Sequence, residues 1–165
     1  MDKHHFILKP SYWKGEGKII LNMVEEVLSF TCQWKISEPD SLGKILAIQQ
    51  IQIAGISDIM HNELTFYEFT QKNFCVDMEN PNLGQIMGNG IYDEKLLAWE
   101  FRNNEMNFEG METYVLQPDN SYQIHIEYVT ADQFRTQIDG KIWEVHEILE
   151  LKRPENEDED DDEQE

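Results

Sequence analysis

Two glycines beside a tryptophan are the first residues whose types and spacing could serve chemistry. Trp13, Gly15 and Gly17 occupy alternate positions, so they share one face of a strand. Glycine weakens a strand unless the strand bends sharply or another group approaches closely. The motif therefore predicts either an indole that closes one end of the fold, with glycines that allow strong coiling, or a place where a ligand approaches the backbone.

Arg135 is the side chain best suited to hold an acidic ligand, because a guanidinium can donate two parallel hydrogen bonds to a carboxylate. Apolar residues occur at both parities of its segment, so either face could point inward. A structural ion pair with Glu112 or Glu127 is the alternative role. Arg135, Trp99 and Tyr128 are the candidates for the interior of the fold.

Four polar residues stand near the centres of predicted strands, and their orientation decides what the interior could bind. They are Gln50, Gln52, Glu100 and Glu112. If they point outward, they form a solvated face. If they point inward, the interior is polar and holds water, because buried polar groups need partners. Such an interior would favour a smaller polar molecule over a plain fatty acid.

The other reactive residue types form no recognisable site. Cys32 has the parity of Phe30 and Trp34 and is expected to be a small buried hydrophobe. His4 and His5 are expected in a flexible N-terminus, and no metal site is expected. The chain contains neither a phosphate-binding glycine loop nor a nucleophile elbow. The sequence therefore favours a binding protein over an enzyme.

Alternation with a period of two dominates the chain and predicts about ten strands. They are expected near residues 12–21, 25–36, 44–54, 60–70, 73–78, 84–92, 94–102, 105–117, 121–130 and 133–150. Helix is limited to a turn or two near 4–12 and 93–97. Because closing a long meander removes both sheet edges, we expect an all-β fold, a single antiparallel up-and-down β-barrel with space for one small ligand. A two-layer sandwich is the alternative.

Charge and composition divide the chain into a barrel domain, 1–153, and an acidic tail, 154–165. The tail holds nine of the 33 acidic residues and no basic one, which predicts disorder. The remaining 24 acids against 13 bases would repel a phosphate backbone, so no nucleic-acid partner is expected. No apolar run is long enough for a membrane span. Two cysteines and no signal-like apolar segment indicate a cytoplasmic protein, and the oligomeric state is not predicted.

The chain resembles the calycin group of β-barrels, which comprises the lipocalins, the fatty-acid-binding proteins and the haem-binding nitrobindins. The resemblance rests on the Trp13-x-Gly15-x-Gly17 opening followed by a ten-strand meander, and on 60–64, Met-His-Asn-Glu-Leu, followed by Phe66. The opening is similar to that of nitrobindins, as is the His-x-Glu segment. This resemblance implies a lipocalin-like small-molecule binding or carrier protein, with an amphipathic or acidic ligand that is lipid-like or a carboxylate.

The members of the calycin group imply different ligand chemistry. Fatty-acid-binding proteins place an interior arginine against a carboxylate, for which Arg135 is the candidate here. Nitrobindins hold haem through a histidine near the C-terminal strand, for which His146 is the candidate, although another match places Ile138 there. Neutral imidazole is the ligand that haem iron would require. No cofactor is expected otherwise, and a structural or protein-interaction module with a packed core and an acidic docking tail is the remaining alternative.

Overall fold

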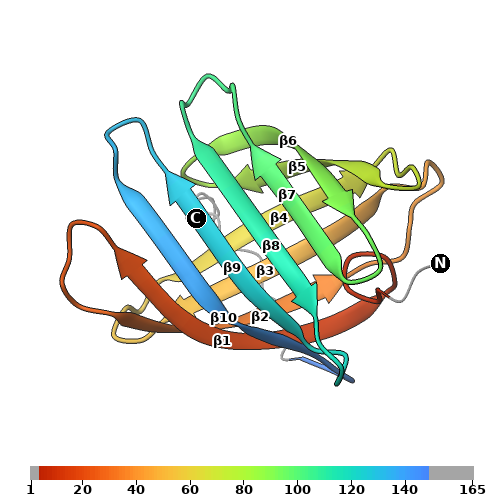
Figure 1. The fold of residues 1–165 in the computed structure, drawn as a ribbon, viewed down its shortest axis with the longest axis horizontal. Coiled ribbons are helices and arrows are strands. Elements are labelled where there is room, and N and C mark those ends of the chain that lie inside the picture. Colours follow the sequence, from red (N-terminus) through yellow and green to blue (C-terminus); the bar gives the residue numbers. More distant parts are fainter. Residues whose placement is uncertain (1–3, 149–165) are drawn as a thin grey trace, which may run out of the picture.

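Ten antiparallel strands close into one barrel in the computed structural model, which describes residues 4–148 (Figure 1). Each strand pairs with the next along the chain, and the last pairs with the first. The strands are β1 (Ser11–Leu21), β2 (Leu28–Ile36), β3 (Ile45–Ile53), β4 (Ile59–Tyr67), β5 (Asn73–Asn80), β6 (Gly84–Tyr92), β7 (Leu96–Phe101), β8 (Glu109–Leu116), β9 (Tyr122–Val129) and β10 (Arg135–Val145). The predicted tail, 154–165, lies outside the described residues.

The alternation of apolar and polar residues explains the closure. In β2, Phe30, Cys32 and Trp34 are buried, whereas Thr31 and Lys35, at positions of the other parity, are exposed. Every strand thus turns one apolar face toward the barrel axis, and the ring of ten leaves no free edge. The predicted all-β up-and-down barrel is confirmed, and the sandwich alternative is wrong. No helix among residues 4–148 is long and apolar enough to cross a membrane.

The predicted strand that begins at residue 105 begins at Glu109 instead. Residues 105–108 belong to the turn that precedes β8, and Asn107 there has a φ of 49°. A left-handed backbone of this kind suits asparagine and does not continue a strand. The apolar residues at 106 and 108 keep the parity of β8, which is why the alternation extends beyond the strand itself.

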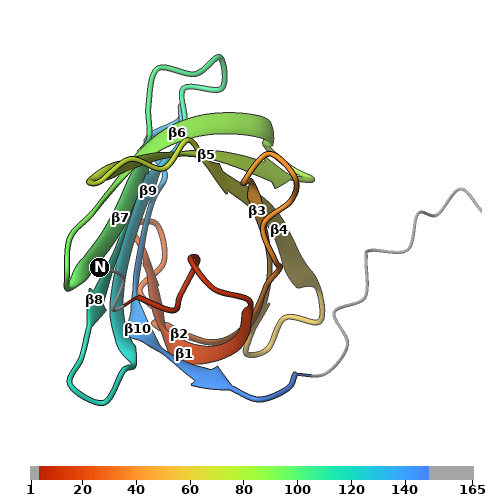
Figure 2. The same cartoon turned by 90° about the vertical axis from the view of Figure 1, so that its right-hand side faces the viewer.

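One end of the barrel is closed by residues 4–10, which cross the opening as a turn (Figure 2). Phe6 and Ile7 have no exposed surface, and the ring of Phe6 meets Trp13 and Trp34 edge-on at centroid distances of 5.2 and 5.1 Å. The short N-terminal turn is confirmed. This N-terminal plug makes the indole of Trp13 part of a packed end wall, where it is 1% exposed.

His4 fastens the N-terminal plug, so the predicted flexibility at this position is wrong. Its Nε2 lies 2.6 Å from the backbone oxygen of Asp93, and its Nδ1 lies 2.6 Å from the hydroxyl oxygen of Tyr122. Because a carbonyl oxygen only accepts, Nε2 donates to Asp93, and in the neutral ring Nδ1 accepts from Tyr122. His4 is 1% exposed, since this pair of hydrogen bonds holds the imidazole inside the closed end.

Gly15 and Gly17 allow close packing where β1 meets its neighbours. A Cβ atom at Gly15 would lie 2.6 Å from Cγ2 of Ile142 and 2.7 Å from Sγ of Cys32, and one at Gly17 would lie 2.8 Å from the ring of Phe30. Real Cβ atoms do not approach other atoms this closely, so only glycine fits. Protein atoms thus occupy the place that a Cβ atom would take at either glycine, which is the close packing expected of a strongly coiled strand.

Candidate functional site

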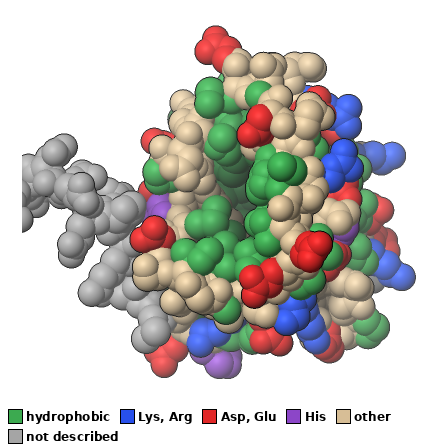
Figure 3. Space-filling model, turned by 90° about the vertical axis from the view of Figure 1, so that its left-hand side faces the viewer, with side chains coloured by type: hydrophobic (Ala, Val, Ile, Leu, Met, Phe, Trp, Pro, Cys, Tyr) green, Lys and Arg blue, Asp and Glu red, His purple; other side chains and the backbone are tan. Residues whose placement is uncertain are grey.

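The barrel interior is open to solvent at the end opposite the N-terminal plug. Figure 3 looks onto that end and shows an apolar depression with several acidic side chains around it. Inward-facing Met60, Ile51 and Ile138 are 42%, 9% and 7% exposed. In the plugged half, inward-facing Tyr122 and Ile142 are fully buried. Water therefore reaches the inner wall of the open half, and the fully packed core that a purely structural module would have is absent from that same half.

The rim of this open mouth carries exposed apolar side chains. Because every strand reverses direction, the connections from odd to even strands all lie at this end. These hairpin loops are residues 22–27, 54–58, 81–83, 102–108 and 130–134. The exposed apolar side chains on them are Met23, Val24, Val27, Ile56 and Met106. Such a rim lets an apolar molecule leave water gradually as it enters.

A buried carboxylate with three hydrogen-bond donors lies on the inner wall. Oε2 of Glu112 accepts from Nε1 of Trp99 at 3.0 Å and from the hydroxyl of Tyr128 at 2.8 Å. Oε1 accepts from the hydroxyl of Tyr114 at 2.7 Å. Glu112 is 3% exposed, and Trp99 and Tyr114 are stacked beside it with ring centroids 4.7 Å apart. We call these four residues the Glu112 cluster.

Neighbouring strands build the Glu112 cluster through their register. Trp99 on β7 is the direct partner of Glu112 on β8, and Tyr128 on β9 is the partner of Gly110, two residues before Glu112. A Cβ atom at Gly110 would lie 2.6 Å from Cδ1 of Tyr128. The missing side chain therefore lets the tyrosine ring lie across β8 and deliver its hydroxyl to the carboxylate.

The Glu112 cluster has no lysine or arginine beside it among the inward-facing strand residues that the structure describes. The inward-facing positions of the ten strands within residues 4–148 include no Lys and no Arg. Burial raises the pKa of Glu112, while the hydrogen bonds from Tyr114, Tyr128 and Trp99 oppose the rise. A buried carboxylate without a cation is costly to the fold, and groups of this kind concentrate at binding and catalytic sites. The Glu112 cluster is therefore the strongest candidate site in the interior.

A chain of three amide side chains lies on the opposite wall. Asn80 accepts from the backbone N–H groups of Asn82 and Leu83, so its oxygen is fixed. Its nitrogen then donates to Asn62 at 2.5 Å, and the nitrogen of Asn62 donates to Oε1 of Gln49 at 3.0 Å. The order of these bonds leaves Nε2 of Gln49 at the end of the chain with no hydrogen-bond acceptor among residues 4–148.

Nε2 of Gln49 is the end of this amide chain and retains some access to solvent. Within the described range, every fully buried side-chain nitrogen or oxygen atom has a hydrogen-bond partner. Since this nitrogen has none, it is not fully buried, although Gln49 as a whole is only 7% exposed and faces inward. The hollow thus presents an acceptor cluster on β8 and a free donor on β3.

The residues predicted for the interior are only partly brought together. Trp99 and Tyr128 both face inward and both donate to Glu112. Trp13 lies apart from them, at the plugged end. Arg135 is exposed on the outer face at the start of β10, so its predicted interior position is wrong. The pKa of the nearby Glu127 carboxyl is lowered, mainly by hydrogen bonds from Gln137 and His125 and to a smaller extent by the charge of Arg135.

Among the four polar residues of undecided orientation, only Glu112 points inward. Gln50, Gln52 and Glu100 stand on the outer face of their strands. The amide chain through Gln49 was missed, because sequence alone does not show that three amides from three different strands meet. Cys32 is buried, as predicted, and burial raises the pKa of its thiol to about 12, so it is not a nucleophile at neutral pH.

The residues lining the hollow do not fit a haem. His146, the candidate iron ligand, is exposed beyond the end of β10. His61 of the nitrobindin-like segment faces outward, where its Nε2 lies 3.5 Å from Oε1 of Glu63. Ile138, the alternative position, faces inward but has no ligand atom. The inward-facing strand positions between residues 4 and 148 include no histidine, so none of them supplies the imidazole that iron would need.

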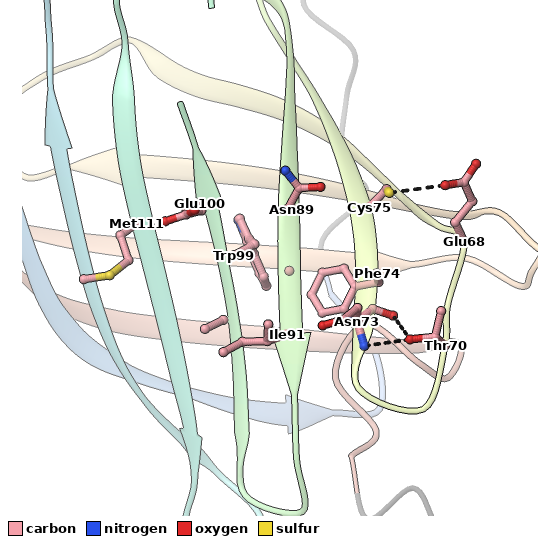
Figure 4. A pocket seen from close by; sticks show the side chains of 12 residues that line it. Glu68, Thr70, Asn73, Phe74, Cys75, Asn89, Ile91, Trp99, Glu100 and Met111 are labelled. Atoms are coloured by element: carbon pink, nitrogen blue, oxygen red, sulfur yellow. Dashed lines mark hydrogen bonds between the residues drawn. The ribbon is translucent and has the colours of Figure 1, made fainter. Parts of the chain in front are cut away.

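A second hollow, of about 590 Å³, lies against the outer face of β5 to β8 (Figure 4). Ile91 and Met111 give its walls an apolar character, and Gly90 contributes only backbone, because a Cβ atom there would meet the ring of inward-facing Phe74. Sγ of Cys75 lies 3.4 Å from Oε2 of Glu68, and burial followed by this hydrogen bond raises the pKa of the thiol. Between residues 4 and 148 no group of three His, Cys, Asp or Glu residues could hold a metal ion. This groove therefore offers shape without reactive groups.

Comparison with known proteins adds no assignment to this geometry. No protein-family model and no curated protein matches the chain. The closed ten-strand antiparallel barrel is consistent with the architecture that the calycin resemblance implies.

Proposed function

We propose that the protein binds a small amphipathic molecule inside the barrel, as a lipocalin-like binding or carrier protein. The observation that carries this proposal is the half-open interior, an apolar depression at the mouth (Figure 3) where inward-facing Met60 is 42% exposed. Ligand sites in proteins are typically concave, mostly apolar and equipped with a few polar groups that fix orientation. The open half has these three properties.

The apolar wall supplies most of the affinity. Burying apolar surface stabilises a complex by about 25 cal/mol per Å², so about 200 Å² of ligand surface contributes roughly 5 kcal/mol before the entropy lost on binding. The buried polar groups supply little net affinity, but they penalise ligands that leave them without partners. Glu112 and Gln49 therefore select among apolar molecules that all fit the wall.

Binding of N-phenyl-1-naphthylamine, a neutral probe whose fluorescence rises in apolar surroundings, tests this proposal. Met60 and Ile59 are neighbours on β4, 42% and 56% exposed, but they face opposite sides of the wall. We expect Met60→Trp to weaken probe binding at least tenfold, because the indole enters the hollow. Ile59→Trp is the matched control and should leave the affinity unchanged.

The same experiment shows how the proposal would fail. Absence of any fluorescence rise with the wild-type chain, or equal affinities for the two tryptophan variants, would place the probe outside the barrel or deny a site altogether. Native mass spectrometry of the protein purified from cells would complement the titration, because a retained molecule would add its mass to that of the chain.

A further inference from the structure

Glu112 has room for one more hydrogen-bond donor. An ionised carboxylate offers about four acceptor positions. Trp99 and Tyr128 occupy two on Oε2, and Tyr114 occupies one on Oε1. The vacant position is therefore on Oε1, and Glu112 stands on the inward face of β8.

The surroundings of Glu112 oppose an acidic ligand. A carboxylate brought into the hollow would need a cation or several donors to replace its hydration. The inward-facing strand positions of residues 4–148 supply no Lys and no Arg, and Arg135 stands outside the wall. The donors of Trp99, Tyr114 and Tyr128 are already turned toward Glu112. A second carboxylate would thus meet a like charge in a region of low dielectric.

Gln49 supplies the complementary polarity from the facing wall. Its strand, β3, is five strands from β8 in the ring of ten, so the two residues lie on opposite sides of the barrel. Nε2 of Gln49 can donate to an oxygen of the ligand. An uncharged polar group that both donates and accepts is therefore compatible with either wall, whereas a carboxylate could use only the side with Gln49.

We propose that the hollow selects amphipathic molecules whose polar end carries an O–H or N–H donor, such as long-chain alcohols or amines, with Glu112 as the acceptor, and that it rejects carboxylates of the same length. The proposal rests on the proposed function, since it assigns the polar end of the molecule that the barrel binds. An interior arginine would imply a preference for carboxylates, whereas an interior Glu112 gives a preference for ligands that donate a hydrogen bond.

Competition among three ten-carbon compounds tests the proposal. Bound N-phenyl-1-naphthylamine is displaced from the wild-type chain with 1-decanol, decylamine and decanoate. We expect 1-decanol or decylamine to displace the probe at concentrations at least tenfold lower than decanoate, because a hydrogen bond to a charged acceptor is worth about that factor. Displacement by decylamine at lower concentrations than by 1-decanol would indicate that Glu112 is ionised. Equal displacement by the two compounds would indicate that an uncharged donor is sufficient.

Two variants separate the role of Glu112 from that of the apolar wall. Glu112→Gln keeps the size of the side chain and removes its charge, so we expect the advantage of decylamine over decanoate to fall at least tenfold while the probe still binds. Glu109→Gln, on the outward face of the same strand, should change nothing. If Glu112→Gln does not fold, Tyr128→Phe serves instead, because it frees a second acceptor position and should preserve the preference for donors.

The outcomes distinguish this proposal from the proposed function. If decanoate displaces the probe as well as 1-decanol and decylamine do, the donor preference is overturned, while ligand binding in the barrel stands. If the wild-type chain binds no probe, the proposed function itself fails. If Glu112→Gln keeps the wild-type order of the three compounds, another group selects the ligand and the role given to Glu112 is wrong.

Discussion

The plugged half and the open half of the barrel are built from the same ten strands but are filled differently. Around the N-terminal plug, large rings from Phe6, Trp13 and Trp34 meet edge to face and exclude water. In the open half, Phe101 and Phe108 also pack ring against ring, but no chain segment among residues 4–148 enters that end, and inward-facing Met60 is 42% exposed. The difference shows that strand pairing fixes the wall, whereas a segment entering one end decides whether that end is core or stays open to solvent.

The polar groups of the two halves also differ, in whether all their hydrogen-bonding positions are occupied by protein partners. In the plugged half, both ring nitrogens of His4 have partners, Tyr122 and the backbone of Asp93. In the open half, Glu112 has a vacant acceptor position and Gln49 a free donor. Polar groups of the first kind hold a structure together, and those of the second kind are available to a ligand.

Truncation of one apolar side chain in each half should give the largest contrast. We expect Phe6→Ala to lower the free energy of unfolding by about 3–5 kcal/mol, because it removes a fully buried ring and leaves a cavity among aromatic neighbours. Met60→Ala in the open half should cost less than about 1 kcal/mol, because its side chain is 42% exposed. Urea unfolding measures both, and similar losses would mean that the halves are equally packed.

A methyl group at Gly110 should have an intermediate effect, confined to the open half. Gly110→Ala places its Cβ against the ring of Tyr128, which we expect to cost about 1–3 kcal/mol and to separate that hydroxyl from Glu112. Glu109→Ala, one residue earlier on the outward face, controls for the change in strand propensity. Denaturant unfolding gives the loss of stability, and an unchanged value for Gly110→Ala would show that the ring can move aside freely.

The pH dependence of stability should reveal the charge of Glu112, as the smallest of the three effects. Because the folded state raises the pKa of Glu112, its protonated form favours folding. Its contribution is fully present below the ordinary value of 4.5 and is lost as the pH rises through the raised pKa. Wild type should therefore lose stability relative to Glu112→Gln over this interval. A difference independent of pH would mean that the pKa of Glu112 is not raised.

The barrel itself could be predicted, because period-two alternation is a local property of the chain. The orientation of Glu112 was also within reach, since it has the parity of Phe108, Gly110 and Tyr114. The orientation of Arg135 could not be predicted, because the outward face of β10 also carries apolar residues near its end. Alternation along this strand therefore does not show which face points inward. A strand that passes a closed barrel end can hold apolar side chains on both faces.

The contacts within the site could not be predicted, because they depend on register between strands that are far apart in sequence. Tyr128 reaches Glu112 only because β9 places it beside Gly110. The amide chain likewise depends on the register of β3, β4 and β5. The N-terminal plug lacks any periodic pattern, and the adjacent apolar pair Phe6 and Ile7 was the one signal that it is buried.

The N-terminal plug closes one end of the barrel with residues that precede β1 and belong to no strand. Residues 4–10 add no rung to the hydrogen-bond ladders of β1 with β2 or β10. Displacement of the N-terminal plug would therefore leave the backbone hydrogen bonds between the strands of the wall in place. Water would instead gain access to the aromatic rings that Phe6 now covers, among them Trp13 and Trp34.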